Sequence, residues 1–226
     1  MREFEADLPV GVGVYEALRR DIVFGRLRSS QKLKLDTLRR DYGASIATLR
    51  EALNRLASEG FVQTEGQRGF FVADMSRDGL REIADLRILL ECHALQLSFE
   101  AGDMDWEAGI VAAHYKLSRM ESRMQEGDET VKERWKQFDW EFHQALILGC
   151  GSRELLTVHR IIFDKYLRYQ MRALTFRGSP AAREHRDLLD AALARDSAKG
   201  QAILQAHIEG GVEHCLAHPS EPLGDI

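Results

Sequence analysis

Apolar residues recur along most of the chain three, four or seven residues apart, which is the spacing of one face of an α-helix. In the later part of the sequence the pattern is carried by Leu80, Ile83, Leu86, Leu90 and Leu97, and then by Trp135, Phe138, Phe142 and Leu146. No proline lies between Pro9 and Pro180, so long helices are expected there. Glycine-containing segments divide the region after residue 76 into about six helices.

The first third of the chain has a different order of patterns. Helical periodicity over residues 13–24, 35–42 and 46–58 is followed by two short apolar pieces, 61–64 and 70–73, on either side of a glycine-containing turn. Two helices, a short turn, a helix and a hairpin are typical of a winged helix-turn-helix. We therefore predict a mainly α protein, with a winged helix-turn-helix DNA-binding domain over residues 1–76 and an all-helical bundle over residues 77–226.

Charge is distributed unevenly between these two regions. The formal net charge is -5, but residues 15–73 contain 11 Lys and Arg against 7 Asp and Glu, whereas the rest of the chain contains 20 against 29. A basic head on an acidic body suits a protein that neutralises DNA phosphates with its head alone.

Targeting and redox features indicate a cytoplasmic protein. No apolar run approaches the length of a membrane span, and acidic residues stand near the start where a signal peptide has basic and apolar ones. The three cysteines, Cys92, Cys150 and Cys215, are scattered, which favours reduced thiols without an assigned role. We expect no association with a membrane.

The third helical pattern has the character of a DNA recognition helix. Ser45 is placed to cap it, and an apolar face leaves Arg50 on the opposite side, where it can reach a guanine edge or a phosphate. The small hairpin tip brings Arg68 to the backbone or the minor groove. The predicted DNA contacts are Arg39, Arg40, Ser45, Ala47, Thr48, Arg50, Gly66, Gln67 and Arg68. The alternative is that Arg50 and Arg55 are solvated helix charges and the hairpin is an ordinary sheet edge.

Three stretches of this region resemble the head of the GntR family of bacterial regulators. They are residues 49–56 (LREALNRL), 59–62 (EGFV) and 66–72 (GQRGFFV). The resemblance implies a winged helix-turn-helix that binds operator DNA. Family members usually carry an arginine directly after the residue that opens the recognition helix, and this chain has Ile46 there, so one usual operator contact is missing.

Histidines and a carboxylate form a candidate metal site in the bundle. Asp139 and His143 stand four apart and so share one helix face, and His185 and His207 lie beside apolar positions of the two following helices. Three imidazoles and one carboxylate that converge in a bundle would suit zinc, nickel or another divalent ion. The alternative is that these are ordinary core or surface histidines.

The same residues resemble the effector domain called FCD, in its metal-binding form, of the FadR subgroup. Asp139-x-x-x-His143, Glu184-His185 and Ala206-His207 carry the resemblance, which covers about residues 80–216. It implies that Asp139, His143, His185 and His207 are the metal ligands. The other histidines, His93, His114, His159, His214 and His218, match no motif position.

Arginines supply a candidate effector site beside the metal. Asp85-Leu86-Arg87 followed by Glu91 also resembles the subgroup, in which the arginine projects into a cavity. Arg87 would then bind a carboxylate, with Arg168, Tyr169 and Arg172 as candidates for the far end of the ligand. An Arg87–Glu91 pair on the helix surface is the alternative. A narrower resemblance of residues 149–152 to regulators of carbon starvation and glutarate metabolism favours glutarate or 2-hydroxyglutarate as effector.

Two functions remain after these steps. The first is a homodimeric repressor that a small carboxylate releases from a palindromic operator. The second is a metal-dependent enzyme that uses the His/Asp site, which no nucleophile motif accompanies and which would not explain the DNA-binding head.

Overall fold

The computed structural model describes residues 10–173 and 176–218. The contacts among these residues define two compact units. One contains residues 10–79 together with 167–172, and the other contains residues 80–166, 173 and 176–218. Ser76, where the sequence analysis placed the domain boundary, directly precedes α4 (Arg77–Ala101).

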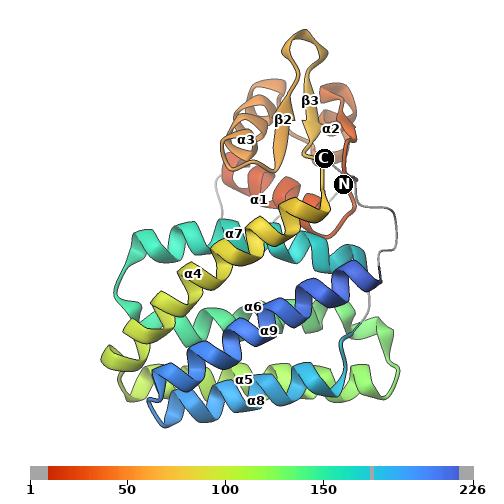
Figure 1. The fold of residues 1–226 in the computed structure, drawn as a ribbon. Helices are drawn as coiled ribbons and strands as arrows, with labels where there is room; N and C mark the ends of the chain where they lie inside the picture. Colours follow the sequence, from red (N-terminus) through yellow and green to blue (C-terminus); the bar gives the residue numbers. More distant parts are fainter. Residues whose placement is uncertain (1–9, 174–175, 219–226) are drawn as a thin grey trace. The chain divides into compact units, whose positions relative to one another are not determined.

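Three helices form the frame of the first unit: α1 (Val10–Val23), α2 (Leu35–Tyr42) and α3 (Ile46–Ser58). The helix α2 ends at Gly43, which has a φ of 64°, a left-handed conformation that glycine adopts without strain. After this turn the side chain of Ser45 caps α3. The helices α1 and α3 pack against each other, with Leu18, Ile22, Leu49 and Leu53 fully buried. These are the three helices that the periodicity predicts (Figure 1).

A small antiparallel sheet completes the first unit. The strand β3 (Phe70–Val72) lies between β1 (Lys32–Leu33) and β2 (Val62–Thr64), and Phe71 pairs with both Lys32 and Gln63. The tip of the β2–β3 hairpin forms a short 3-10 helix, Gly66–Arg68. The hairpin follows the prediction, but the two-residue strand β1 has no sequence signal of its own.

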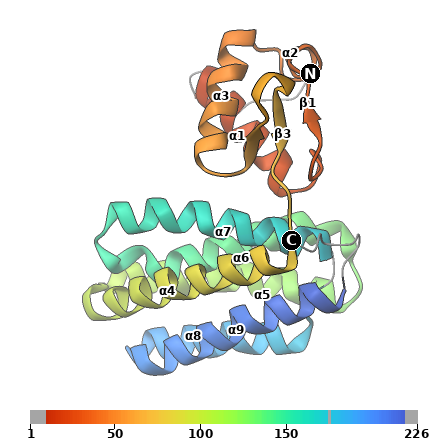
Figure 2. The same ribbon diagram turned by 45° about the horizontal axis from the view of Figure 1, so that its top comes forward.

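Among the described residues, the second unit contains α5 (Met104–Gln125), α6 (Lys132–Ile147), α8 (Ser179–Leu193) and α9 (Ser197–Ala217), together with α4 from Leu80 onward and most of α7 (Arg153–Ala173). Side chains of Asp103 and Asp196 cap α5 and α9, where they accept hydrogen bonds from backbone amides at 2.8 and 3.0 Å. The helix α5 packs against α6 and α8, and Figure 2 shows α8 and α9 side by side.

The interior of the bundle combines an apolar core with a group of buried polar side chains. Phe142, Phe163 and Leu204 are fully buried. The polar residues Glu91 and His143 have exposed fractions of at most 1%. Such polar groups are costly to bury unless they are paired, so their arrangement points to a functional site. In the part of the chain that the structure describes, no helix is long and apolar enough to span a bilayer.

Candidate DNA interface and metal centre

The helix α3 presents one polar face because its apolar face is fully used in packing. Leu49, Leu53 and Leu56 have no exposed surface, whereas Arg50 is exposed. The Oγ atom of Ser45 accepts a hydrogen bond of 3.1 Å from the Thr48 amide and lies 2.9 Å from the Thr48 hydroxyl. The first turn of α3 is therefore ordered before any DNA contact is made.

A basic cleft lies between α3, β1 and the hairpin. Its volume is about 500 Å³, and its lining residues include four cations, Lys32, Lys34, Arg50 and Arg68, and no carboxylate. Arg68 also pairs with Glu65 and lies 5.4 Å from the centre of the Phe71 ring, which holds its side chain along the hairpin. A cleft of this charge suits a phosphate backbone.

The predicted DNA contacts fall into three groups, of which Ser45, Ala47 and Thr48 form the cap and first turn of α3. Arg50, Gly66, Gln67 and Arg68 line the cleft. Arg39 and Arg40 are exposed in the last turn of α2, and Arg40 pairs with Asp41 at 3.3 Å. The sequence reasoning missed Lys32 and Lys34, because a two-residue strand leaves no periodic pattern by which a loop lysine could be assigned to the interface.

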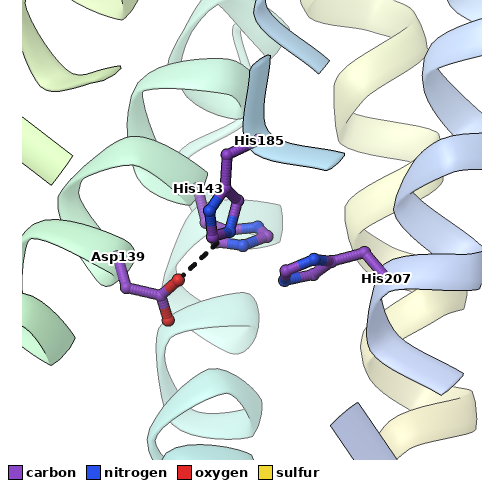
Figure 3. A group of neighbouring side chains, drawn as sticks. All are labelled: Asp139, His143, His185 and His207. Atoms are coloured by element: carbon purple, nitrogen blue, oxygen red, sulfur yellow. Dashed lines mark ion pairs between the residues drawn. The ribbon is translucent and has the colours of Figure 1, made fainter. Parts of the chain in front are cut away.

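The four predicted metal ligands lie together inside the bundle. Asp139 and His143 stand one turn apart on α6, His185 comes from α8 and His207 from α9. One potential ligand atom from each lies within 4.8 Å of the others, and all four residues are buried. In Figure 3 the three imidazole rings and the Asp139 carboxylate point toward one another.

A different glutamate holds the Nδ1 atom of each histidine. Nδ1 of His143 lies 2.6 Å from Glu91, that of His185 lies 2.7 Å from Glu121, and that of His207 lies 2.8 Å from Glu184. A carboxylate can only accept, so we assign the proton to Nδ1 in each ring, which leaves Nε2 as the free acceptor.

The donor set fits a divalent metal. The Nε2 atom of His143 is buried and has no hydrogen-bond partner, and the buried Nε2 of His185 faces Asp139 Oδ1 at 3.3 Å. A buried nitrogen without a partner is costly, and metal-bound histidines commonly donate their other ring N–H to a carboxylate. If the ion binds, the Asp139 carboxylate and the Nε2 atoms of His143, His185 and His207 are the groups that would hold it.

Electrostatic interactions within the cluster shift several pKa values. Burial raises the pKa of Asp139, but Lys136 and His185 outweigh it and hold that pKa well below its usual range. Burial lowers the pKa of His185, but Asp139 and Glu121 outweigh it and raise the pKa to about 9. Burial lowers the pKa of both His143 and His207. Without a metal, the proton of the cluster therefore resides on His185.

Arg87 lies beside the cluster but is engaged by Glu91. Its Nε donates to a Glu91 carboxylate oxygen at 2.6 Å, and Nη2 lies 3.1 Å from Nδ1 of His143. The guanidinium also lies 4.3 and 4.7 Å from the ring centres of Phe163 and Tyr166. The Arg87–Glu91 pair that the spacing allowed does form, although it is 1% exposed and not on the helix surface.

Sequence reasoning missed the partners of the ligands. His159, which matched no motif position, is fully buried, with Nδ1 2.8 Å from Gln144 and Nε2 3.4 Å from Glu91. A glutamate or lysine on a helix is normally read as solvated, so Glu121 and Lys136 give no local signal. Glu91 and Glu184 lie inside stretches that the family resemblance had singled out, but neither was assigned to a histidine.

The other predicted effector arginines contact the segment that precedes α4. Arg168, Tyr169 and Arg172 lie in the part of α7 that groups with residues 10–79. Arg168 Nη2 donates to the Ala73 carbonyl at 2.5 Å, and Arg172 Nη1 lies 4.0 Å from the Met75 sulfur. These arginines bind the backbone and side chain of the segment that precedes α4.

Two sequence families match the chain. The family described as bacterial regulatory proteins, gntR family, matches residues 11–72, and the FCD domain family matches residues 82–210. The second match covers more than half of the chain and includes all four residues of the cluster.

Similar proteins are transcription regulators. An uncharacterized HTH-type transcriptional regulator, BphR, of Paraburkholderia xenovorans is 38% identical over 201 residues, 88% of this chain and 82% of the relative. The HTH-type transcriptional repressor GlaR of Escherichia coli is 32% identical over 202 residues, 86% of this chain and 90% of the relative.

Solved structures show the same fold at lower identity. The Escherichia coli protein McbR/YncC has a TM-score of 0.77 at 21% identity, with 93% of this chain and 98% of that chain covered. A GntR transcriptional regulator of Rhodococcus sp. RHA1 has a TM-score of 0.74 at 20% identity, with 92% and 97% covered.

Proposed function

The chain belongs to the gntR family of bacterial regulatory proteins, with an FCD domain after its winged helix-turn-helix, and from this premise we propose a metal-containing repressor that a small carboxylate releases from its operator. Like the relatives described above, it is a DNA-binding transcription regulator and not an enzyme. The metalloenzyme alternative is therefore set aside.

Operator binding is assigned to α3 and the wing. Arg50 on the exposed face of α3 would read a base edge in the major groove, while Lys32, Lys34 and Arg68 would hold phosphates along the basic cleft. The exposed Arg39 and Arg40 of α2, with Ser45, Ala47 and Thr48 in the first turn of α3, complete the proposed interface.

The observation that carries the sensing role is the cluster of Asp139, His143, His185 and His207. Its ligand atoms converge within 4.8 Å, and the buried Nε2 atom of His143 has no hydrogen-bond partner. Zinc or nickel suits three imidazoles and one carboxylate. Such an ion would supply an open coordination position for an oxygen of the effector, while the chain's own glutamates hold the imidazole rings in orientation.

An anionic effector is favoured by the charges around the cluster. Arg87 contacts His143, Lys136 contacts Asp139 and Arg177 contacts His207, and the three glutamates that hold the histidines offset these cations. The two positive charges of the proposed ion would then leave the site with an excess of positive charge. A small dicarboxylate such as glutarate or 2-hydroxyglutarate would bring the matching negative charge. The name of the GlaR relative supports the choice of a repressor.

A homodimer is the proposed form on DNA, acting in the cytoplasm. A single winged head presents one short recognition helix, and two heads that read a palindrome multiply the specificity of one. The expected operator is thus an inverted repeat.

The test is a gel shift with DNA from the promoter of the protein's own gene. Zinc-loaded protein should retard this DNA, and glutarate or 2-hydroxyglutarate should release it, whereas protein treated with a chelator should bind DNA but ignore the acids. Absence of metal from purified protein, together with release by acids after chelation, would contradict the metal-dependent part of the proposal.

A further inference from the structure

The helix α7 belongs to both compact units of the chain. It is one unbroken helix over Arg153–Ala173 (Figure 1), yet Tyr166 and the residues before it group with the bundle, whereas residues 167–172 group with residues 10–79. Tyr166 and Arg168 stand on either side of this division. Because residues two positions apart point to nearly opposite sides of an α-helix, one short stretch of α7 serves both units.

Tyr166 contacts the neighbours of two cluster residues. Its side chain is fully buried, and its hydroxyl donates a hydrogen bond of 2.9 Å to the carbonyl of Ile208, which directly follows His207 on α9. Its ring centre lies 4.7 Å from the Arg87 guanidinium, whose Nη2 atom is 3.1 Å from Nδ1 of His143. A shift of either histidine can therefore reach Tyr166 through closely packed groups.

Arg168 binds the base of the wing. Within the unit that contains residues 10–79, its Nη2 atom donates to the carbonyl of Ala73, the residue that follows β3. The Ala73 amide donates a hydrogen bond of 2.9 Å to the carbonyl of Phe61, which precedes β2, and Ser29 Oγ donates to the Ala73 carbonyl at 3.4 Å. Ala73 is thus the point at which the two hairpin strands and Arg168 are joined.

The burial of Arg168 indicates a specific role for this contact. Only 7% of the residue is exposed, and burial lowers its pKa to about 10, so the guanidinium stays charged at neutral pH. Burial of a charge is costly, and an apolar side chain of similar length would pack without that cost. The contact with the Ala73 carbonyl therefore explains an arginine at this position better than packing does.

We propose that α7 carries changes at the cluster to the wing, with Tyr166 and Arg168 as the positioning residues at the two ends of this connection. When an ion or an effector displaces His143 or His207, Tyr166 follows, and the hydrogen-bonded helix moves as one body. Arg168 then shifts the Ala73 carbonyl and with it β3, one strand of the proposed DNA-binding wing. This inference rests on the proposed release of the operator and assigns Arg168 to the wing, not to the effector.

The coupling factor is the ratio of operator affinities without and with saturating glutarate, measured by fluorescence anisotropy with the zinc-loaded full chain. In the wild type it should be about 5- to 150-fold, the usual range of allosteric coupling, and in Arg168→Met below about twofold. The variant should bind glutarate in calorimetry, and operator DNA without acid, nearly as the wild type does, since the hydrogen bond between Ala73 and Phe61 remains. Arg153→Met, at an exposed position at the start of α7, is the matched control and should keep the wild-type factor.

Three other results for Arg168→Met would overturn the proposal. Full release of the operator by glutarate would show that the connection does not run through Arg168. Loss of glutarate binding would make Arg168 a ligand of the effector, and loss of operator binding without acid would make it a structural part of the head.

Tyr166→Phe tests the other end of the connection and serves if Arg168→Met does not fold. It removes the hydroxyl that binds Ile208 but keeps the ring beside Arg87. The coupling factor should fall about three- to tenfold, as the loss of one buried hydrogen bond allows. An unchanged factor in this variant would overturn the role of Tyr166 and with it the connection.

Hydrogen exchange with zinc alone tests the connection without any assumption about the effector. Zinc would join α6, α8 and α9, so its addition to the metal-free wild type should slow amide exchange both in α7 and in residues 70–76. In Arg168→Met the slowing should persist in α7 and disappear in residues 70–76. Slowing of residues 70–76 in the variant, or its absence there in the wild type, would overturn the proposal. If no carboxylate binds but zinc gives the expected pattern, the effector proposal fails and the connection stands.

Discussion

At the scale of single residues, the bundle site depends on side chains that do not belong to the cluster itself. Each histidine turns its Nε2 inward because a glutamate holds the opposite nitrogen, at 2.7 Å in the case of His185 and Glu121. Both residues are nearly fully buried, so water cannot replace the carboxylate if it is lost.

Glu121→Ala should therefore lower zinc affinity about ten- to hundredfold, as removal of a histidine's carboxylate partner does in metal sites generally. Competition with a coloured chelator measures this affinity. Glu126→Ala, at an exposed position just beyond the end of α5, is the matched control and should bind zinc normally. Equal affinities of the two variants would show that Glu121 does not orient His185.

The pH dependence of the metal-free protein follows from His185. Asp139 and Glu121 raise its pKa to about 9 against the effect of burial, whereas in the unfolded chain it titrates near 6.5. The folded state gains the full stabilisation below pH 6.5 and loses it as the pH rises to 9, so the free energy of unfolding should fall by up to about 3 kcal/mol over this range.

Urea unfolding of chelator-treated protein at several pH values measures this fall. His185→Gln should remove it, since the variant has no proton to lose in that window. A wild-type stability that is constant from pH 6.5 to pH 9 would contradict a charged His185. Zinc must displace the same proton, so zinc affinity should rise with pH where the stability of the metal-free protein falls.

The residue types of the site were accessible from the sequence, but their environment was not. Asp139 and His143 share a helix face by spacing alone, and the family resemblance supplied His185 and His207. Spacing equally allowed Arg87 and Glu91 to pair, but only packing against Phe163 and Tyr166 decides that this pair is buried. Only the packing of the helices shows that His159 lies near Glu91 and that Lys136 is buried beside Asp139.

At the scale of elements, the recognition helix separates packing from DNA contact residue by residue. Arg50 is exposed on α3 and lines the basic cleft, whereas Leu49 and Leu53 on either side of it are buried. Arg50→Ala should thus lower operator affinity by about 1–3 kcal/mol without a change in the melting temperature, if it makes a bidentate base contact.

Fluorescence anisotropy with labelled operator DNA measures the loss. Arg20→Ala removes one exposed arginine from the last turn of α1 and is the matched control for the loss of charge. Equal and small losses in both variants would exclude Arg50 from the base contacts.

The wing should behave differently from the helix. Arg68 and Lys32 line the cleft and both lie over the Phe71 ring, a position that suits phosphate contacts. For Arg68→Ala and Lys32→Ala we expect losses of operator affinity that shrink as salt is raised, because fewer counterions are released. Affinity measured from 50 to 300 mM salt tests this; a loss that is independent of salt would indicate base readout instead.

The sequence predicted the longer elements and missed the shortest one. Helices α2 and α3 were located because their apolar positions repeat over two or more turns, and the β2–β3 hairpin because a glycine-containing turn separates two apolar pieces. The strand β1 consists of two residues, which is too short for alternation to appear, and it pairs with a strand far away in sequence. It is therefore the pairing of β1 with β3 that places Lys32 at the cleft.

At the scale of the whole molecule, the proposed function requires two compact units with different ligands to influence each other. Thermodynamic linkage makes that influence reciprocal: if the acid lowers operator affinity by some factor, operator DNA lowers acid affinity by the same factor. In the proposed mechanism the acid response depends on the metal, so removal of one ligand of the cluster should uncouple the units without damage to either.

His207→Ala tests this uncoupling, because His207 is the cluster residue that lies on α9, and its removal leaves Asp139, His143 and His185 in place. The variant should bind operator DNA like the wild type, but glutarate should no longer release it. Zinc at a hundred times its dissociation constant should stabilise the wild type by about 2.7 kcal/mol and the variant much less. Glu209→Ala, an exposed position on the same helix, should respond like the wild type in both assays. Full release of His207→Ala by glutarate would show that the acid acts without the cluster, whereas loss of DNA binding in the absence of acid would show that the cluster supports the head directly.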